Sequence, residues 1–277
     1  MAKVMAVILN YNSIDDTKKC VAFLKKQNNV SLQICIVDNN STDGKVEELK
    51  AFGEDNDCIV ICNTKNGGYS AGNNIGLKRA AEEKCDYAII INPDVEVRDE
   101  DYVKKAIDKL QEDKDVVVLG TDIININNQH QNPLKEMNFF KEVFFPVSFL
   151  SGKVGKKNPG VGNYKKSGYC EKVSGCIFFI SVPFIKEQSY LDEHVFLFCE
   201  ESILGKMVKN ANKKMYYYAD ATAYHQHGAE EKEASAKKWK IFIDSRKYYL
   251  KNYSGYTGLR LKLAIKSKDI QYKIHNK

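Results

Sequence analysis

The chain has 277 residues, of which 43% are hydrophobic and 28% are charged, and its formal net charge is +6. This length fits one large domain, or one domain with a modest appendage. The composition provides enough apolar residues for a sizeable core and excludes an intrinsically disordered chain.

Short apolar runs and helical patterns alternate along the first part of the chain. The apolar runs are read as buried strands at 4–9, 32–37, 58–62, 87–91 and 116–119. Helical spacing of apolar residues predicts helices near 13–24, 46–52, 71–85 and 102–110. Ser13, with Asp16 three residues later, resembles a capping box at the start of the first helix. This order of elements predicts an α/β fold, with a mostly parallel sheet covered by helices on both faces.

The second half of the chain is less regular. From about 125 to 170 the pattern fades, and we interpret this segment as a variable loop region with some strand. Further strands are predicted at 173–182, 216–218 and 221–224, and a helical segment at 204–208. Two helical faces, at 239–253 and 259–274, close the chain.

The C-terminal segment from Lys237 to Lys277 is basic, with twelve Lys or Arg against two acids. A basic tail on a near-neutral body predicts an anionic partner, and the candidates are an anionic lipid surface and a nucleic acid. The alternative is a solvated helix that packs on the core.

The cysteines and the apolar runs indicate the compartment. Eight cysteines lie mostly within apolar runs and form no CxxC pair, which indicates buried free thiols in a reducing cytosol. No signal peptide is visible, and the longest later apolar run, 173–185, is broken by Ser, Gly and Pro. The sequence therefore predicts a cytoplasmic protein.

Polar residues follow each of the first four predicted strands, at 10–12, 38–43, 63–76 and 92–94. In an open parallel sheet, ligands bind beyond the carboxyl ends of the strands. Asp38 could accept hydrogen bonds from a base or a ribose. The glycine-rich stretch that follows the third strand offers backbone N–H groups to a phosphate or a sugar. Asp94 suits Mg²⁺ or Mn²⁺ that bridges a diphosphate.

Each of these features also has a plainer interpretation. Asp38 and Asp43 could cap the following helix, the glycines could only form turns, and Asp94 could be a turn residue. The convergence of four strand ends on one edge favours a binding crevice over these separate explanations.

A second cluster lies later in the chain. Glu200 and Glu201 follow the apolar run 195–199, where two adjacent carboxylates are costly unless they are used or solvated. One of them could be a general base with a raised pKa. His225 and His227 could contact a cation and a phosphate or sugar, in either order, although a histidine is often structural.

Together these residues resemble the family-2 glycosyltransferases with the GT-A fold, and most of all the rhamnosyltransferase-like enzymes of bacterial surface polysaccharide synthesis. The segments that carry the resemblance are 7–12 (VILNYN), 36–43 (IVDNNSTD), 66–76, 92–95 (NPDV), 174–176 (SGC), 198–201 (FCEE), and His225 with Gly228. The resemblance implies a catalytic domain at 1–230 and a basic helical extension at 231–277. The catalytic domain would divide into a nucleotide-sugar-binding half, 1–97, and an acceptor-binding half, 98–230.

The resemblance also implies roles for single residues. Asp94 and His225 would bind Mg²⁺ or Mn²⁺. Glu201 would deprotonate the acceptor hydroxyl, with Glu200 as the alternative because the family pair is usually Glu-Asp. The acceptor would lie beside Gly175 and Cys176. The UDP- or dTDP-linked sugar donor would be contacted by Asn10, Asn12, Asp38, Asn40, Asn66, Gly67, Gly72, Asn73 and Asn92.

The implied reaction is a single in-line displacement that inverts the anomeric configuration and moves the sugar to a saccharide or a lipid-linked acceptor. The chain lacks the QxxRW signature of processive polysaccharide synthases, which favours transfer of one sugar per binding event. Peripheral attachment to the inner face of the cell membrane and a homodimer both remain open.

Two other classes of protein fit less well. A dinucleotide-binding oxidoreductase needs GxGxxG directly after the first strand, where this chain has Asn10, Tyr11 and Asn12. A nucleic-acid binder would not gather acids at the strand ends, where they repel phosphate. We therefore expect no nucleic-acid partner.

Overall fold

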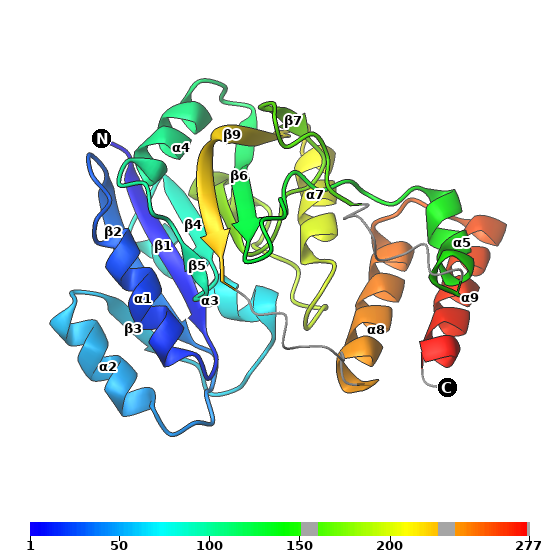
Figure 1. Cartoon of the computed structure of the whole chain (residues 1–277), viewed down its shortest axis with the longest axis horizontal. Coiled ribbons are helices and arrows are strands. Elements are labelled where there is room, and N and C mark those ends of the chain that lie inside the picture. The colour runs from blue at the N-terminus through cyan, green and yellow to red at the C-terminus, as the bar shows by residue number, and fades with distance from the viewer. Residues whose placement is uncertain (151–159, 227–235, 276–277) are drawn as a thin grey trace.

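The computed structural model describes residues 1–150, 160–226 and 236–275 of the chain (Figure 1). In the first part, strands and helices alternate as the apolar runs predict. These elements are β1 (Lys3–Asn10), α1 (Ile14–Leu24), β2 (Ser31–Asp38), α2 (Val46–Asp55), β3 (Ile59–Cys62), α3 (Tyr69–Glu82), β4 (Tyr87–Ile91), β5 (Val95–Glu96), α4 (Tyr102–Gln111) and β6 (Val116–Asn125). The second part contains α5 (Phe139–Leu150), β7 (Gly168–Cys170), β8 (Ile177–Ser181), α6 (Val182–Glu187), α7 (Glu200–Asn210), β9 (Lys214–His225), α8 (Ala236–Asn252) and α9 (Gly258–His275).

One sheet runs through the protein in the order β3-β2-β1-β4-β8-β6-β9-β5, with β7 beside β9. The first four strands in this order are parallel, as predicted from the alternation of strands and helices. β8 lies antiparallel between β4 and β6, and β9 then pairs parallel with β6. The α/β fold is therefore confirmed, with a sheet that is parallel in its first half and mixed in its second.

The parallel register sets where the strands end. Asn10 at the end of β1 lies beside Asp38 at the end of β2, and Asp38 lies beside Cys62 at the end of β3. The chain then continues in register, because the Asn63 amide donates to the Asp38 carbonyl oxygen at 2.8 Å. The polar segments that follow these strands consequently emerge along one edge of the sheet.

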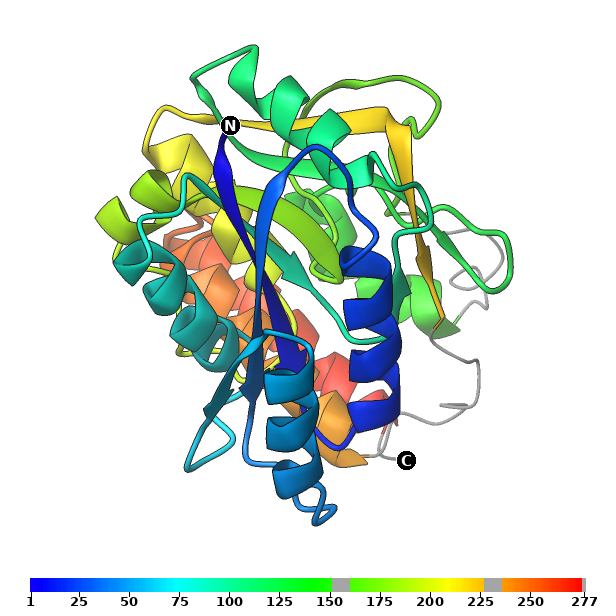
Figure 2. The same cartoon turned by 90° about the vertical axis from the view of Figure 1, so that its left-hand side faces the viewer.

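Helices cover both faces of the sheet, as predicted. Successive side chains of a strand point to opposite faces, so Ala6 and Ile8 of β1 pack with α1, α2 and α4, whereas Met5 and Val7 pack with α3, α6 and α7. Figure 2 shows α1 and α2 on one side of the sheet and α3 on the other. Two buried apolar layers therefore hold the strand ends in a fixed frame.

The helix α5 was not predicted. The segment 125–170 was interpreted as a variable loop, but it holds α5 and the short strand β7. The sequence of α5, FFKEVFFPVSFL, is apolar on nearly all sides and contains Pro146, so it shows neither a helical period nor an uninterrupted helix-forming pattern. The two short strands predicted at 216–218 and 221–224 are one strand, β9, with a register irregularity between them.

The capping box predicted at the start of α1 is wrong. Ser13 occupies the N-cap position, but its side chain makes no cap hydrogen bond. Its hydroxyl donates instead to the Asn10 side-chain oxygen, at 3.1 Å. Ser13 therefore helps to fix the end of β1 rather than the first turn of α1.

The last two helices pack with α5 at the end of the molecule opposite to α2 and β3 (Figure 1). A small apolar cluster joins α7, α8 and α9 through Ile203, Leu250 and Ala264. The predicted extension is thus helical in its described part, and the domain boundary at residue 230 stays a prediction. None of the described helices has the length and apolar character that crossing a membrane requires.

Candidate active site

Asp38 organises the loop after β2. Its carboxylate accepts from the Asn10 side-chain amide at 2.8 Å, from the Ser41 hydroxyl at 2.6 Å and from the Ser41 amide at 3.0 Å. The side chain is only 1% exposed. Asp38 does not cap α2, because the residue at that N-cap is Lys45, whose amide is hydrogen-bonded by Asp43 at 3.1 Å.

Three further residues predicted to contact the sugar donor lie on the same edge of the sheet and are more exposed than Asp38. Asn12 exchanges backbone and side-chain hydrogen bonds with Ser41 and Thr42, and Asn40 is exposed in a left-handed conformation with φ 63°. Asn66 is partly buried, and its side-chain oxygen accepts from the Gly68 amide at 3.0 Å. Tyr11 lies among them and is 46% exposed.

Asn39 joins the strand ends, and the sequence reading missed it. Its side-chain nitrogen donates to the Asn66 side chain at 3.0 Å and to the Gly68 carbonyl at 3.2 Å. Its oxygen accepts from Asn63 at 3.2 Å. One buried amide thus links the loops after β2 and β3. A signal was present in the run Asp-Asn-Asn, but alternation along the chain does not show which of these residues points inward.

The glycine-rich segment after β3 allows close packing of α3, in addition to its predicted place in the binding site. A Cβ at Gly72 would lie 2.4 Å from a Leu9 methyl group, so α3 approaches β1 closely only because residue 72 is glycine. Asn73 is fully buried, and its side-chain nitrogen donates to the Tyr69 carbonyl oxygen at 3.0 Å. Gly67 lies in the loop before α3, where a Cβ would lie 2.8 Å from the Cβ of Ala71.

We expect Gly68→Ala to destabilise the protein more than Gly44→Ala. Gly68 has φ +91°, and a Cβ there would lie 2.2 Å from the Phe196 carbonyl oxygen, whereas Gly44 has φ +76° with open space around it. The control therefore carries only the backbone strain, about 1–3 kcal/mol. Urea unfolding of both variants measures the difference, and equal midpoints would show that Phe196 yields to the methyl group.

Asp94 and His225 lie together at the next strand end. The Asp94 carboxylate is 3.3 Å from His225 Nε2, and the Gln226 amide donates to the Asp94 carbonyl oxygen at 2.8 Å. His225 Nδ1 lies 2.9 Å from the Gln131 side-chain oxygen, which can accept a ring proton carried on Nδ1. The Nε2 lone pair then faces the carboxylate, an arrangement that suits a cation between the two groups.

The sequence predicts these two residues as metal ligands, and the structure places them side by side. Among the described residues, no group of three or more His, Cys, Asp or Glu side chains is arranged so that it could hold a metal ion. Two protein ligands fit Mg²⁺ or Mn²⁺ when diphosphate oxygens and water complete the coordination. The other predicted histidine, His227, and Gly228 lie outside the described residues.

The segment Ser174-Gly175-Cys176 bridges the strand ends and α7. The Asn92 amide donates to the Cys176 carbonyl oxygen at 2.8 Å, and the Tyr69 hydroxyl donates to the Gly175 carbonyl oxygen. A Cβ at Gly175 would lie 3.5 Å from the Glu201 carboxylate. Burial raises the pKa of the Cys176 thiol to about 12, with contributions from the negative charges of Asp94 and Glu201. The two predicted acceptor residues therefore lie between the predicted metal ligand and the predicted base.

The two adjacent glutamates line the same small cavity but differ at their carboxylates. The cavity is also lined by Val173, Phe178, Leu191 and Leu204, and Glu200 Oε2 is buried with no hydrogen-bond partner. Burial, reinforced by the charge of Glu201, raises the pKa of Glu200 well above its usual value. Its surroundings therefore favour the protonated form of Glu200, and the Glu201 carboxylate lies beside Gly175. Both begin α7, where the helix dipole favours negative charge.

A family comparison covers most of these residues. Residues 5–178 match the family model described as glycosyl transferase family 2. The chain belongs to glycosyl transferase family 2. The match spans more than half of the chain, from β1 through the Ser174-Gly175-Cys176 segment, and so includes the strand ends described above.

Curated and solved glycosyltransferases resemble the whole chain. The low-salt glycan biosynthesis hexosyltransferase Agl10 of Haloferax volcanii is 22% identical over 251 residues, which cover 90% of this chain and 75% of Agl10. The mannosyltransferase PcManGT from Pyrobaculum calidifontis, solved with GDP-Man and Mn²⁺, superposes with a TM-score of 0.64 at 13% identity over 99% of this chain and 71% of its own. TarS of S. aureus, solved with UDP, gives a TM-score of 0.59 at 14% identity over 98% of this chain and 72% of its own.

These likenesses establish this protein as a glycosyltransferase with the GT-A fold. The rhamnosyltransferase-like subgroup, the roles of single residues and the metal remain predictions. The convergence of strand ends inferred from sequence is present, with Asn10, Asp38 and Asn92 on one edge.

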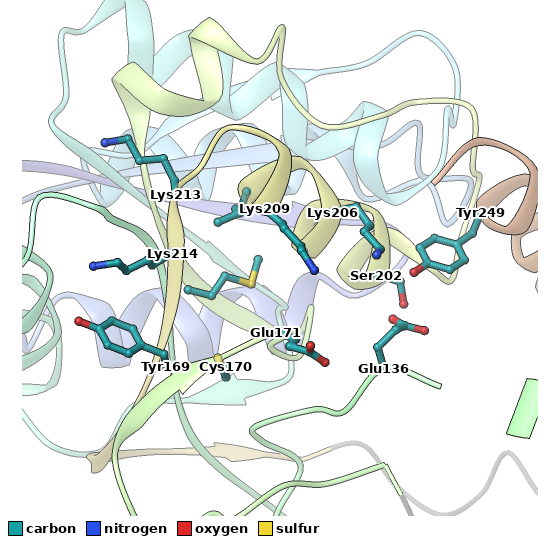
Figure 3. A pocket seen from close by; sticks show the side chains of 13 residues that line it. Glu136, Tyr169, Cys170, Glu171, Ser202, Lys206, Lys209, Lys213, Lys214 and Tyr249 are labelled. Atoms are coloured by element: carbon teal, nitrogen blue, oxygen red, sulfur yellow. The ribbon is translucent and has the colours of Figure 1, made fainter. Parts of the chain in front are cut away.

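A cavity of about 340 Å³ lies elsewhere on this glycosyltransferase, between α7, β7 and the start of β9 (Figure 3). Its lining includes four lysines, Lys206, Lys209, Lys213 and Lys214. None of the predicted site residues is among the described residues that line it. Asp115 and Asp113 hold Lys213 and Lys214 in ion pairs at 2.8 and 3.1 Å. The sequence reading gave no sign of this cavity.

Proposed function

We propose that this glycosyltransferase moves one sugar from a UDP- or dTDP-linked donor to a hydroxyl group of a saccharide or lipid-linked acceptor, with inversion of the anomeric configuration. The reaction would belong to cell-surface polysaccharide synthesis at the cytoplasmic side of the membrane. The observation that carries this proposal is the position of Gly175 and Cys176, which link Asn92 beside Asp94 to Glu201.

The donor would lie along the polar edge of the sheet. The open side chains of Asn12 and Asn40, with the loop held by Asp38, would meet the nucleoside. The exposed Tyr11 ring is available to stack on the base. PcManGT was solved with GDP-Man and TarS with UDP, which supports a nucleotide-linked donor but does not choose among nucleotides.

Asp94 and His225 would hold Mg²⁺ or Mn²⁺ against the diphosphate. When bound, the metal neutralises the charge that develops on the leaving nucleoside diphosphate. The Mn²⁺ in the PcManGT structure supports this choice of cofactor. Gln131 would keep His225 in the tautomer that can bind a metal, because its oxygen lies 2.9 Å from Nδ1.

Glu201 would act on the acceptor. Its carboxylate takes the proton of the acceptor hydroxyl while that oxygen bonds to the anomeric carbon and the bond to the diphosphate oxygen breaks. A single displacement of this kind inverts the anomeric centre. The Oε2 atom of Glu200 is buried without a hydrogen-bond partner and the pKa of Glu200 is raised, so we assign the base to Glu201.

A thermal-shift panel of UDP-, dTDP- and GDP-sugars, each with Mn²⁺ or EDTA, tests the donor class. A sugar nucleotide at one hundred times its Kd should raise the free energy of unfolding by about 2.7 kcal/mol. For a chain of this size that corresponds to a Tm increase of about 5 °C. No shift with any donor would contradict the proposal.

Asp94→Ala should remove the Mn²⁺-dependent part of this shift, since the variant lacks a carboxylate ligand. Asp55→Ala is a suitable control, because Asp55 is an exposed acid on α2, away from this edge. We expect the control to keep the full response to Mn²⁺ and donor. If Asp94→Ala binds the donor as well as the control in Mn²⁺ and in EDTA, Asp94 is no metal ligand.

A further inference from the structure

Half of the large hydrophobic side chains that are exposed in the described part of the chain lie on only two helices, α5 and α9. These are Phe140, 69% exposed, Phe144, 59%, Leu259, 71%, Leu263, 41%, and Ile270, 44%. Single exposed apolar residues are ordinary, whereas a group of this size marks an interaction surface.

The exposed residues form rows on neighbouring helices. Phe140 and Phe144 are one turn apart on α5, and Leu259, Leu263 and Ile270 follow one face of α9 at spacings of four and seven. The two helices are joined, since the Ser267 hydroxyl on α9 donates to the backbone carbonyl oxygens of α5 at 2.9 and 3.1 Å. They lie side by side at one end of the molecule (Figure 1). We call the five residues the α5–α9 patch.

The polarity of α5 is reversed relative to a helix that faces water. Its fully buried residue is Glu142, which contacts Arg246 at 2.6 Å and Lys268 at 2.9 Å. Two of its three exposed residues in the described side chains are Phe140 and Phe144, and the third is Lys141. An amphipathic helix of a soluble domain places these types the other way round. The arrangement suits a helix with an apolar medium on its outer side.

Exposed positive charge surrounds the α5–α9 patch. Lys141, Lys262, Lys266 and Lys273 are exposed, and none of them forms an ion pair among the described residues. Arg260 is also exposed and stacks on the rings of Phe139 and Tyr256. The acid on α9, Asp269, is paired with Lys247 of α8. An apolar group within a basic border matches the boundary between acyl chains and anionic head groups.

We propose that the α5–α9 patch docks this protein on an anionic lipid bilayer, with Phe140 and Phe144 in the acyl boundary and the surrounding lysines at the head groups. A second copy of the chain fits this surface less well, because a symmetric pairing would bring two basic borders together. Docking does not depend on the transfer reaction. If the proposed function also holds, the surface would bring the enzyme to a lipid-linked acceptor.

Vesicle flotation of the full chain tests the proposal. Wild type should float with vesicles of 70% phosphatidylcholine and 30% phosphatidylglycerol and float less with phosphatidylcholine alone. Phe140→Ser with Phe144→Ser should abolish flotation, whereas Ile126→Ser, at another exposed apolar residue that is 47% exposed, should not. Because all three side chains are exposed, their replacement should leave the fold intact.

A second pair of variants tests whether docking requires the positive charges beside the α5–α9 patch. Lys262→Gln with Lys266→Gln should weaken vesicle binding about 30-fold, since each lysine near an anionic surface contributes about fivefold. Lys206→Gln with Lys209→Gln, two lysines on α7 that lie away from the patch, should bind as wild type does.

Three results would overturn the docking proposal. The first is no flotation of wild type, and the second is equal flotation of wild type and the double phenylalanine variant. The third is a dimer, measured by light scattering, that the phenylalanine variant turns into a monomer. The donor thermal shift of the same variants is a separate readout, so loss of docking and loss of donor binding can be told apart.

Discussion

Glu201→Gln is expected to lower kcat by about 10²–10⁴-fold, the usual contribution of a positioned general base. The amide keeps the size of the side chain and its place beside Gly175 but cannot take a proton. Release of nucleoside diphosphate from the donor selected by thermal shift measures the rate, with water or an acceptor as the attacking hydroxyl. Donor affinity should stay near that of wild type, because we expect Glu201 to contact the acceptor and not the donor. Unchanged turnover would remove Glu201 from the mechanism.

Glu200→Gln is the matched control. Burial and the charge of Glu201 raise the pKa of Glu200 and favour its protonated form, and a glutamine resembles a protonated glutamate in size and hydrogen bonding. We therefore expect near wild-type turnover at neutral pH. The reverse outcome, an inactive Glu200→Gln beside an active Glu201→Gln, would exchange the two roles.

The stability of Glu200→Gln relative to wild type is expected to increase with pH. The pKa of Glu200 is raised in the folded state, so between the unfolded and the folded pKa the folded chain holds a proton that the unfolded chain has lost. Wild-type stability therefore falls as pH rises through that window and levels off above the folded pKa. Glu200→Gln removes this loss, and its stability relative to wild type should increase with pH.

The sequence predicted the frame of the site because local patterns determine it. Apolar runs of strand length define β1, β2, β3 and β4, and their order makes them parallel. The carboxyl ends then meet at one edge, so Asn10, Asp38 and Asn92 could be placed together without knowledge of the packing. The pairing of Asp94 with His225 likewise followed from the family resemblance.

Features that depend on packing from distant segments were missed. Glu200 is one of two adjacent glutamates in the sequence, and burial beside apolar residues of other elements, such as Phe178 and Leu191, raises its pKa. Gly72 was read as a ligand contact, but its lack of a side chain also allows α3 to approach β1. The sequence pattern did not predict α5 because its one acidic residue, Glu142, faces inward and pairs with Arg246 and Lys268, more than a hundred residues later in the chain.

Arg246→Met is expected to reduce the free energy of unfolding by about 3–5 kcal/mol, since it leaves a buried carboxylate without its main partner. Arg246 is 4% exposed and Glu142 is buried, and their closest approach is 2.6 Å. Burial alone would raise the pKa of Glu142, but the hydrogen bonds and charge of Arg246, with those of Lys268, hold it below its usual value. Urea unfolding measures the loss. Lys240→Met, which breaks the exposed pair with Asp244 on the same helix, should cost less than about 1 kcal/mol.

The substitution of Arg246 should also weaken contacts of α7, the helix that carries the proposed base. Arg246 contacts Glu136 at 2.9 Å, Glu136 contacts Lys172 at 3.4 Å, and the Lys172 ammonium donates to the Ser202 hydroxyl at 3.3 Å. Ser202 follows Glu201 in α7, so this chain of charges connects the last two helices to the proposed base. Replacing Arg246, Glu142 and Lys268 together with Met, Leu and Met should recover much of the lost stability, because no unpaired buried charge remains among these three positions. If the triple variant is as unstable as Arg246→Met alone, side-chain packing rather than the uncompensated carboxylate accounts for the loss.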